Sequence, residues 1–436
     1  MRAAACLLLL LLVSPAGAVA QSDADVARAT ERLVPALVAI RQDLHRNPEL
    51  SNRETRTAGV VERELRRLGL EVRTGVARTG VIGVLRGARP GRTVGVRADM
   101  DALPVTEATE VPYRSTATTQ YLGRDVGVSH ACGHDVHVAV ALGVAEVLAG
   151  MRRQLSGTVV FVFQPAEEGP PPGEKGGAQL MVEEGVLREY APEIMLALHT
   201  NGSPPDDAGD NERTGTVSWR AGPFMASSTA WRARIVGRQS HGAYPHVGID
   251  AIVTATQVVQ ALQTIRSRTV DPTEPAVVTV GTLRAGDRNN VVAGEALLSG
   301  TVRTFSDSLT TVIRERMTAI FEGVTRAAGA TYELDFYQWN PVTANDTALT
   351  ARFVPVLERV LGKGNVKPMH LAMGAEDFAY FSREVPSFYY DIGVVNPGNV
   401  SGGHHTPTFR ADDEAIPVGV RTMAALVLDY LRGKGK

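Results

Sequence analysis

Apolar residues recur along this chain at two different spacings, and the two spacings alternate. Short β-branched runs at residues 93–98 and 157–163 indicate strands, and the apolar run at 193–198 indicates another buried strand. Helical spacing of apolar residues covers 24–68, with an interruption at Pro48, and 136–148. Polar or charged residues follow each strand. Strands that alternate with helices, with polar groups where the strands end, predict an open α/β sheet whose functional site lies at the strand ends.

The pattern changes after residue 200. Residues 201–213 are rich in Pro, Gly, Asp and Asn, which is typical of a connection. The order then becomes strand, helix, strand, strand, helix, strand, with the strands at 229–237, 276–285, 296–305 and 331–336 and the helices at 250–267 and 309–328. This is the split βαβ order of a ferredoxin-like unit. Because helix and strand return over 341–436, we predict a small α+β unit inserted into a larger α/β domain.

The first residues have the layout of a cleaved secretory signal. A basic Met1-Arg2 start precedes an apolar run at 3–13 and the small residues at 18–20. The apolar run is too short to span a bilayer comfortably, and no later stretch is long and apolar enough to do so. We expect a mature chain that begins near Gln21 and is exported to the periplasm.

Charge and cysteine content narrow the classes of partner. The 45 Lys and Arg residues nearly balance the 47 Asp and Glu residues, so the sequence does not favour nucleic acid or an anionic membrane as a partner. Only two cysteines occur, and Cys6 lies in the predicted leader. The remaining Cys132 cannot form an intramolecular disulfide, so an apolar core must hold the fold.

Cys132 stands among residues that bind divalent metals. A single glycine separates it from His134. A short turn of this kind lets the thiolate and the imidazole point into one cavity. A small buried cysteine near a helix start is the alternative reading. Downstream, Glu167 and Glu168 follow an apolar strand. Neighbouring side chains of an extended chain point apart, so one carboxylate can reach a metal while the other takes a proton from water; a solvated acidic loop is the alternative.

Two further histidines fall where the sheet would bring loops together. His199 closes a predicted strand, and His405 lies in a turn before Thr406-Pro407. Histidines after buried strands are often structural, but here five possible ligands fall in loops at one sheet edge. Other residues fit the role of fixing a ligand histidine's tautomer: Asp99 and Asp101, and also Asp135 and His137, which alternatively start the following helix.

Several longer motifs resemble a known family. They are RQDLH at 41–45, PEL at 48–50, RADMDALP at 97–104, the runs around Cys132 and Glu167, GAEDF at 374–378 and HH at 404–405. Together they resemble the M20 metallopeptidase family, in its amidohydrolase branch of hippurate hydrolases, N-acyl-amino-acid hydrolases and auxin-conjugate hydrolases. The resemblance covers essentially the whole mature chain in the right order.

The resemblance implies a domain layout. We expect a Zn-peptidase-like α/β catalytic domain with an inserted ferredoxin-like α+β satellite that serves as lid and dimerisation domain. The expected division is a signal peptide at 1–20, a first segment of the catalytic domain at 21–222, the satellite at 223–336 and a second segment of the catalytic domain at 337–436. A homodimer is expected by resemblance alone.

The same resemblance implies a centre of two divalent metal ions per subunit. The implied ligands are Cys132, His134, Glu168, His199 and His405. Cys132 would take the bridging place that a carboxylate holds in other branches, and Glu167 would be the general base. Zn or Mn are the first expectations, and Co and Ni also suit this mixed sulfur, nitrogen and oxygen set.

Three satellite residues also match family positions. His241, within SHGAYPH at 240–246, resembles the histidine that completes an active site, often that of the partner subunit in dimers. Asn290 and Arg303 match positions associated with binding an oxyanion or a carboxylate; a loop cap and a solvated strand arginine are the alternatives. The run at 170–175 resembles an insertion that shapes substrate access.

The expected reaction is hydrolysis of the amide bond of an N-acyl amino acid or small peptide-like conjugate, by water that the metals activate and Glu167 deprotonates. One alternative is a thiol hydrolase with Cys132 as nucleophile and His134 as base. Another is a non-catalytic binding protein on the same scaffold. No Gly-x-Ser-x-Gly elbow supports a serine hydrolase.

Overall fold

The computed structural model describes residues 15–204, 207–398 and 401–433. Residues 1–14 of the predicted signal peptide lie outside the described residues, and its remaining residues belong to helix α1 (Pro15–Arg46). Within the described ranges, no helix combines the length and the apolar character that crossing a membrane requires.

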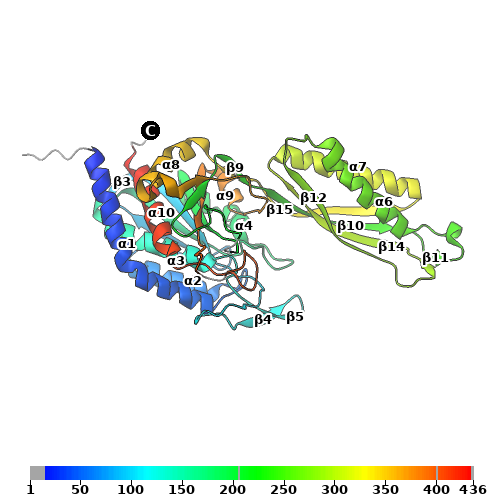
Figure 1. Ribbon diagram of the computed structural model, residues 1–436, viewed down its shortest axis with the longest axis horizontal. Coiled ribbons are helices and arrows are strands. Elements are labelled where there is room, and N and C mark those ends of the chain that lie inside the picture. The colour runs from blue at the N-terminus through cyan, green and yellow to red at the C-terminus, as the bar shows by residue number, and fades with distance from the viewer. Residues whose placement is uncertain (1–14, 205–206, 399–400, 434–436) are drawn as a thin grey trace, which may run out of the picture.

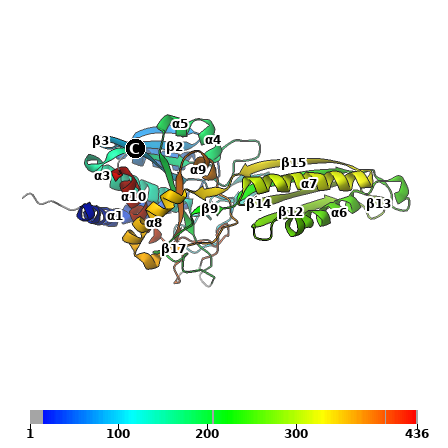
Figure 2. The ribbon, with the colours of Figure 1, turned by 90° about the horizontal axis from the view of Figure 1, so that it is seen from above.

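The chain forms two lobes that lie end to end along the long axis of the molecule, as two perpendicular views show (Figure 1, Figure 2). The larger lobe contains an eight-stranded sheet and both ends of the described chain. The smaller lobe contains a four-stranded sheet. Each lobe has its own apolar core.

The large sheet is mixed, with a parallel centre. Its strands lie in the order β1 (Glu71–Val76), β2 (Gly80–Arg86), β6 (Ser156–Gln164), β3 (Arg89–Asp99), β7 (Ile194–Asn201), β18 (Ser387–Gly393), β8 (Val217–Trp219) and β17 (Val366–Pro368). Strands β6, β3, β7 and β18 run parallel, so their carboxyl ends meet at one edge. This is the α/β sheet that the strand and helix pattern predicts.

Helices cover both faces of the large sheet, which explains why its central strands are almost continuously apolar. One face packs against α1, α2 (Thr55–Arg67), α3 (His134–Gly150), α8 (Thr347–Leu361) and α10 (Ala415–Arg432). The other packs against α4 (Gly177–Glu183), α5 (Val186–Tyr190) and α9 (Ala379–Glu384). The helical pattern over 24–68, which Pro48 interrupts, forms the two helices α1 and α2. Strands β1 and β2 were not predicted.

The small sheet has the predicted order of elements. Its strands lie in the order β12 (Ala276–Ala285), β14 (Glu295–Thr304), β10 (Ser227–Val236) and β15 (Thr331–Asn340), all antiparallel. Helices α6 (Ala251–Thr264) and α7 (Asp307–Ala328) cover one face, where Trp231 and Ile235 of β10 are buried. The Asp250 and Ser306 side chains accept backbone N–H groups and cap these two helices. The boundaries 223–336 of a separate domain stay a prediction.

Short pieces complete the structure. Strands β9 (Gly222–Met225) and β16 (Thr343–Asn345) pair with each other just before and just after the small sheet, so the two connections between the lobes run together. Strands β4 (Thr118–Tyr121) and β5 (Arg124–Gly127) form a hairpin on the large lobe, and β11 (Ser240–His241) pairs with β13 (Val291–Val292) at the far end of the small lobe (Figure 1). Among the described residues, short 3₁₀ helices lie at Arg152–Gln154, Pro245–Val247 and Lys363–Asn365, and a π-helical turn lies at Ile265–Thr269.

Candidate metal centre

Cys132 lies in the turn that leads into α3, at the carboxyl edge of the large sheet. Gly133, the residue before that helix, has a φ of +88°, and a Cβ placed there would lie 2.4 Å from Oγ1 of Thr200. Glycine is therefore the residue that this turn accepts. Thr200 in turn donates its hydroxyl to the carbonyl oxygen of Cys132 at 2.8 Å. The turn is thus fixed against the end of β7.

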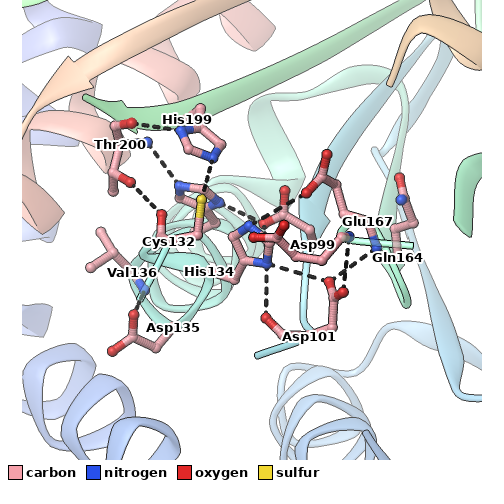
Figure 3. A network of polar contacts seen from close by, with 12 residues as sticks. Asp99, Asp101, Cys132, His134, Asp135, Val136, Gln164, Glu167, His199 and Thr200 are labelled. Carbon is pink, nitrogen blue, oxygen red and sulfur yellow. Dashed lines mark hydrogen bonds and ion pairs between the residues drawn. The ribbon is translucent and has the colours of Figure 1, made fainter. Parts of the chain in front are cut away.

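Three imidazoles surround the sulfur of Cys132. Its Sγ atom lies 3.4 Å from Nε2 of His199, 3.3 Å from Nε2 of His405 and 3.5 Å from Nδ1 of His404. The sulfur and the His199 ring point toward each other in Figure 3. The sequence predicted His199 and His405 as neighbours of Cys132 but missed His404.

The hydrogen bonds of two histidines select the nitrogen that faces the centre. Nδ1 of His134 lies 2.8 Å from the carbonyl oxygen of Asp101, and Nδ1 of His199 lies 2.5 Å from that of Thr200. A carbonyl oxygen only accepts, so each Nδ1 donates and each Nε2 keeps a lone pair. The Nε2 atom of His134 is buried and has no hydrogen-bond partner among the described residues.

Glu167 and Glu168 follow β6 at the same edge, and their carboxylates reach different parts of the centre. Glu168 Oε1 lies 3.2 Å from Nε2 of His405, and Glu167 Oε2 lies 3.8 Å from Nε2 of His134. The Asp101 carboxylate accepts the backbone N–H groups of Glu167 and Glu168 at 3.1 and 3.0 Å. Asp101 and Glu167 lie side by side in Figure 3. Asp101 therefore holds the backbone of this acidic pair in place.

The five predicted ligands come together as two groups that share the thiol. Cys132, His134 and His199 form one group and Cys132, Glu168 and His405 the other, with ligand atoms within 4.8 Å of one another in each. The donor set of sulfur, imidazole and carboxylate is that of divalent transition metals, and the buried Nε2 of His134, which has no hydrogen-bond partner among the described residues, is available to bind one. The residues thus fit two metals, with Cys132 in the shared place.

Asp99 and His137 lie behind this centre. Nδ1 of His137 lies 2.5 Å from Asp99 Oδ1, and its Nε2 accepts the N–H of Thr200 at 2.8 Å. Both ring nitrogens of His137 are occupied, so His137 does not face a metal. Asp99 approaches His134 only to 3.9 Å, whereas Asp101 Oδ1 lies 3.3 Å from it. Of the two predicted carboxylates, Asp101 is the one beside a predicted ligand.

A buried cluster of acids around Arg97 adjoins Glu167. The Arg97 guanidinium lies 2.6 Å from Asp99, 2.7 Å from Glu376 and 3.2 Å from Asp377. Carboxylate oxygens of Glu376 and Asp377 come within 4.8 Å of Glu167. Burial raises the pKa of Glu167, and the Glu376 carboxylate raises it further. A carboxylate with a raised pKa is a stronger proton acceptor, as general-base chemistry requires.

Asp135 faces away from the centre and ties α3 to α1. Its Oδ2 lies 2.8 Å from Nε of Arg41 and 2.8 Å from Nδ1 of His45. All three side chains are buried. Burial lowers the pKa of His45, but the Asp135 carboxylate and the hydrogen bonds to Asp135 and Glu107 together raise the pKa above its ordinary value. Asp135 therefore supports the helix that carries His134.

The three predicted satellite residues belong to the small lobe, and two of them lie at its far end. His241 and Asn290 are exposed neighbours at the far end of the small lobe, where the N–H of Gly242 donates to the Asn290 carbonyl at 2.8 Å (Figure 1). Arg303 is half-buried at the other end of that sheet, where it pairs in register with Ser228. Burial lowers the pKa of Arg303.

A cavity of about 580 Å³ opens beside Glu167 and Glu168. The loop at 169–176 forms one wall, and Arg232, Tyr337 and Asn340 of the small lobe contribute to another. The predicted insertion at 170–175 thus lies on the path to the acidic pair.

The sequence missed four residues of this region: Arg97, Glu376, Asp377 and His404. Three of them stand inside the longer motifs, at 97–104 and 374–378, and His404 directly precedes a predicted ligand. Position in a motif was therefore the available signal, but a motif does not state which atoms its side chains contact.

Comparisons with known proteins agree with this geometry. Residues 95–429 match the model of peptidase family M20/M25/M40. Thermostable carboxypeptidase 2 of Saccharolobus solfataricus is 34% identical over 90% of this chain and 95% of its own length. An N-acetyldiaminopimelate deacetylase of Geobacillus thermodenitrificans is 35% identical over 91% and 97%, and IAA-amino acid hydrolase ILR1-like 2 of Arabidopsis thaliana is 34% identical over 91% and 86%.

Solved structures give the same assignment. A crystal structure of a protein from methicillin resistant Staphylococcus aureus superposes with a TM-score of 0.84 at 32% identity, covering 94% of this chain and 100% of that one. The Bacillus subtilis YXEP protein, described as a dinuclear metal binding peptidase from the M20 family, superposes with a TM-score of 0.74 at 30% identity, covering 92% and 99%. The motif resemblance and the α/β fold class are confirmed: this chain belongs to peptidase family M20/M25/M40 and is a hydrolase that acts on amides.

Proposed function

We propose that this hydrolase cleaves the amide bond of N-acyl amino acids or small peptide-like conjugates at a centre of two divalent metals. The observation that carries the proposal is the membership of Cys132 in two three-ligand groups, with Glu167 beside them. The relatives named a deacetylase and an IAA-amino acid hydrolase support a small acylated substrate.

The ligands would be Cys132, His134, Glu168, His199 and His405. Zn and Mn are the first candidates, since imidazole and thiolate suit Zn and carboxylate suits Mn. Metals bound there would lower the pKa of water and polarise the carbonyl of the scissile amide.

Glu167 is the proposed general base. It takes the proton of the attacking water and returns it to the leaving amine, because its carboxylate lies beside the ligand groups without belonging to the two that share Cys132. The buried acids around Arg97 keep its proton affinity high. The Asp101 carboxylate accepts the backbone N–H of Glu167, which fixes the backbone that carries the Glu167 carboxylate.

Arg303 is the proposed site for the substrate carboxylate. Its guanidinium is half-buried, and within the described part of the chain it forms no ion pair. A desolvated guanidinium without a carboxylate partner favours an anion. Arg303→Lys is expected to raise KM for N-acyl amino acids and to leave KM for the matching N-acyl amino amides unchanged.

His241 and Asn290 are proposed to act on the centre of the partner subunit in a homodimer. Both residues are exposed, and the paired strands β11 and β13 that contain or adjoin them lie at the far end of the small lobe, away from the large lobe that carries the ligands (Figure 1, Figure 2). This place supports a role in another copy. A mixture of His241→Ala and Glu167→Gln subunits tests this directly. Exchange should restore about a quarter of the activity if His241 acts across the dimer, and none if it acts within its own chain.

The thiol hydrolase has less support. Burial raises the pKa of the Cys132 thiol, and Glu168 raises it further, whereas a nucleophilic cysteine needs a lowered pKa. The base of that alternative, His134, directs its Nε2 toward Glu167. The position of Glu167 disfavours a binding protein without catalysis. Its carboxylate lies beside the proposed ligands His134 and Glu168, where it can take a proton from water, and it belongs to neither of the two groups that share Cys132.

Two measurements test the proposal together. The purified protein is assayed for bound metals and against a panel of N-acyl amino acids with aromatic, aliphatic and acetyl groups. We expect divalent metal and hydrolysis of at least one class; binding of panel members without turnover would favour the binding protein. Export is a further proposal, supported by the leader pattern alone, and N-terminal sequencing of the mature protein should begin near Gln21.

A further inference from the structure

His404 stands apart from the histidines proposed as ligands. It precedes His405 in the turn after Gly403, and its ring contacts those of Phe409 and His199. The ring centroids are 4.7 Å apart for Phe409 and 5.4 Å apart for His199. Phe409 is buried, so it fixes one side of the imidazole.

A backbone N–H group determines which atom the His404 ring presents to Cys132. The N–H of Gly202 donates to Nε2 of His404 at 3.2 Å. An N–H group cannot accept, so Nε2 carries the lone pair, and the neutral imidazole has its hydrogen on Nδ1. That Nδ1 atom lies 3.5 Å from Sγ of Cys132. His404 therefore turns a hydrogen toward the sulfur.

This polarity is opposite to that of the ligand histidines. His134 and His199 use the hydrogen of Nδ1 on backbone carbonyls and keep the lone pair of Nε2 for the centre. Because Gly202 occupies its Nε2, His404 has no lone pair left to give to a metal.

We propose that His404 is a positioning residue that donates an N–H···S hydrogen bond to the thiolate of Cys132 and is not a ligand. The inference rests on the proposed metal centre. A hydrogen bond to sulfur withdraws electron density from it and sets the direction of its lone pairs, which matters most for a sulfur shared by two metals.

Two amide substitutions of His404 distinguish the roles of its two ring nitrogens. The amide nitrogen of Asn lies close to the place of Nδ1, whereas that of Gln lies close to the place of Nε2. His404→Asn therefore keeps a donor toward the sulfur, and His404→Gln removes it. His370→Gln, on an exposed histidine, is the control for the substitution itself.

The test is the absorption spectrum and the cobalt affinity of the Co(II)-substituted full chain. We expect His404→Gln to move the thiolate-to-cobalt charge-transfer band to longer wavelength, because the sulfur becomes more electron-rich, and to weaken cobalt binding about 10-fold. His404→Asn and His370→Gln should keep the wild-type band and affinity. Circular dichroism of the metal-free variants establishes that they are folded.

The outcomes are distinct. A band and affinity that are unchanged in His404→Gln would overturn the hydrogen bond while leaving the metal centre intact. Loss of one of two bound cobalt ions in both His404→Gln and His404→Asn would make His404 a ligand and also overturn it. A wild-type cobalt protein without any charge-transfer band would refute thiolate ligation, and the proposed centre would fail with the inference.

Discussion

Sγ of Cys132 and Nε2 of His405 lie 3.3 Å apart, although 273 residues separate them in the chain. The small lobe is inserted between the two segments that they come from, and β9 and β16 pair where the chain leaves and re-enters the large lobe. The centre therefore exists only when both segments of the large lobe have folded together. Substitutions that disturb the packing of these two segments are therefore expected to weaken metal binding even when they leave the ligands themselves unchanged.

Cys132→Ser should lower bound metal from two equivalents toward one or none, because a neutral hydroxyl is a poor substitute for a shared thiolate. Cys132→Asp is the matched variant, since a carboxylate can occupy the shared place. It should keep more metal than Cys132→Ser, as measured by elemental analysis after dialysis. Equal metal content in wild type and Cys132→Ser would remove Cys132 from the centre.

Glu167→Gln should lower kcat by about 10²–10⁴-fold without loss of metal, because it removes the proton acceptor but not a ligand. Glu168→Gln is the control next to it in the sequence and should lose metal as well as activity. Activity and metal content are measured on the same samples. Full amidase activity of Glu167→Gln at unchanged metal content is the result that would reject Glu167 as base.

Asp135→Asn should destabilise the protein by about 3 kcal/mol, because it removes the fully buried one of the two carboxylates that pair with the buried guanidinium of Arg41 and leaves only the partly exposed Asp413. The exposed pair of Glu71 and Arg86 supplies the control, and Glu71→Gln should change the free energy of unfolding by less than about 1 kcal/mol. Urea unfolding of metal-free protein measures both. Similar small effects for the two variants would show that Asp135 is not structurally important.

Glu54 should make stability depend on pH. Burial, followed by the nearby Asp101 carboxylate, raises the pKa of Glu54 from 4.5 to about 7. Because the folded pKa is raised, the native state prefers the protonated carboxyl, and this stability is full below about pH 4.5 and lost as pH rises through about 7.

Glu54→Gln isolates this contribution. Its amide oxygen can still accept the N–H of Ala166, which Glu54 holds at 2.8 Å. The difference in free energy of unfolding between variant and wild type should shift by about 3 kcal/mol in favour of the variant from about pH 4.5 to about pH 8. A difference that stays constant with pH would show that Glu54 does not titrate in this range.

Much of the fold followed from spacing. The β-branched runs and the split βαβ order appear where they were predicted, since alternation and helical period depend on local sequence. The strands β1 and β2 were missed because β2 is almost wholly buried and β1 mostly exposed, so neither shows a regular alternation of apolar and polar residues.

The ligand set was predictable in composition, but its contacts were not. Parallel strands that end at one edge brought Cys132, His134 and His199 together, as expected. The tautomer of His404 depends on a backbone N–H from Gly202, 202 residues away, and no sequence pattern encodes that contact. Likewise, the sequence did not show that Asp99 serves His137 rather than a ligand.

The two-metal centre is tested most directly by titrating metal into chelator-stripped protein while following hydrolysis of an N-acyl amino acid. We predict that the stripped protein is inactive and that activity rises to a plateau near two equivalents of divalent metal per chain. Full activity in the stripped protein, abolished by alkylation of Cys132, would contradict this centre and establish a thiol hydrolase instead.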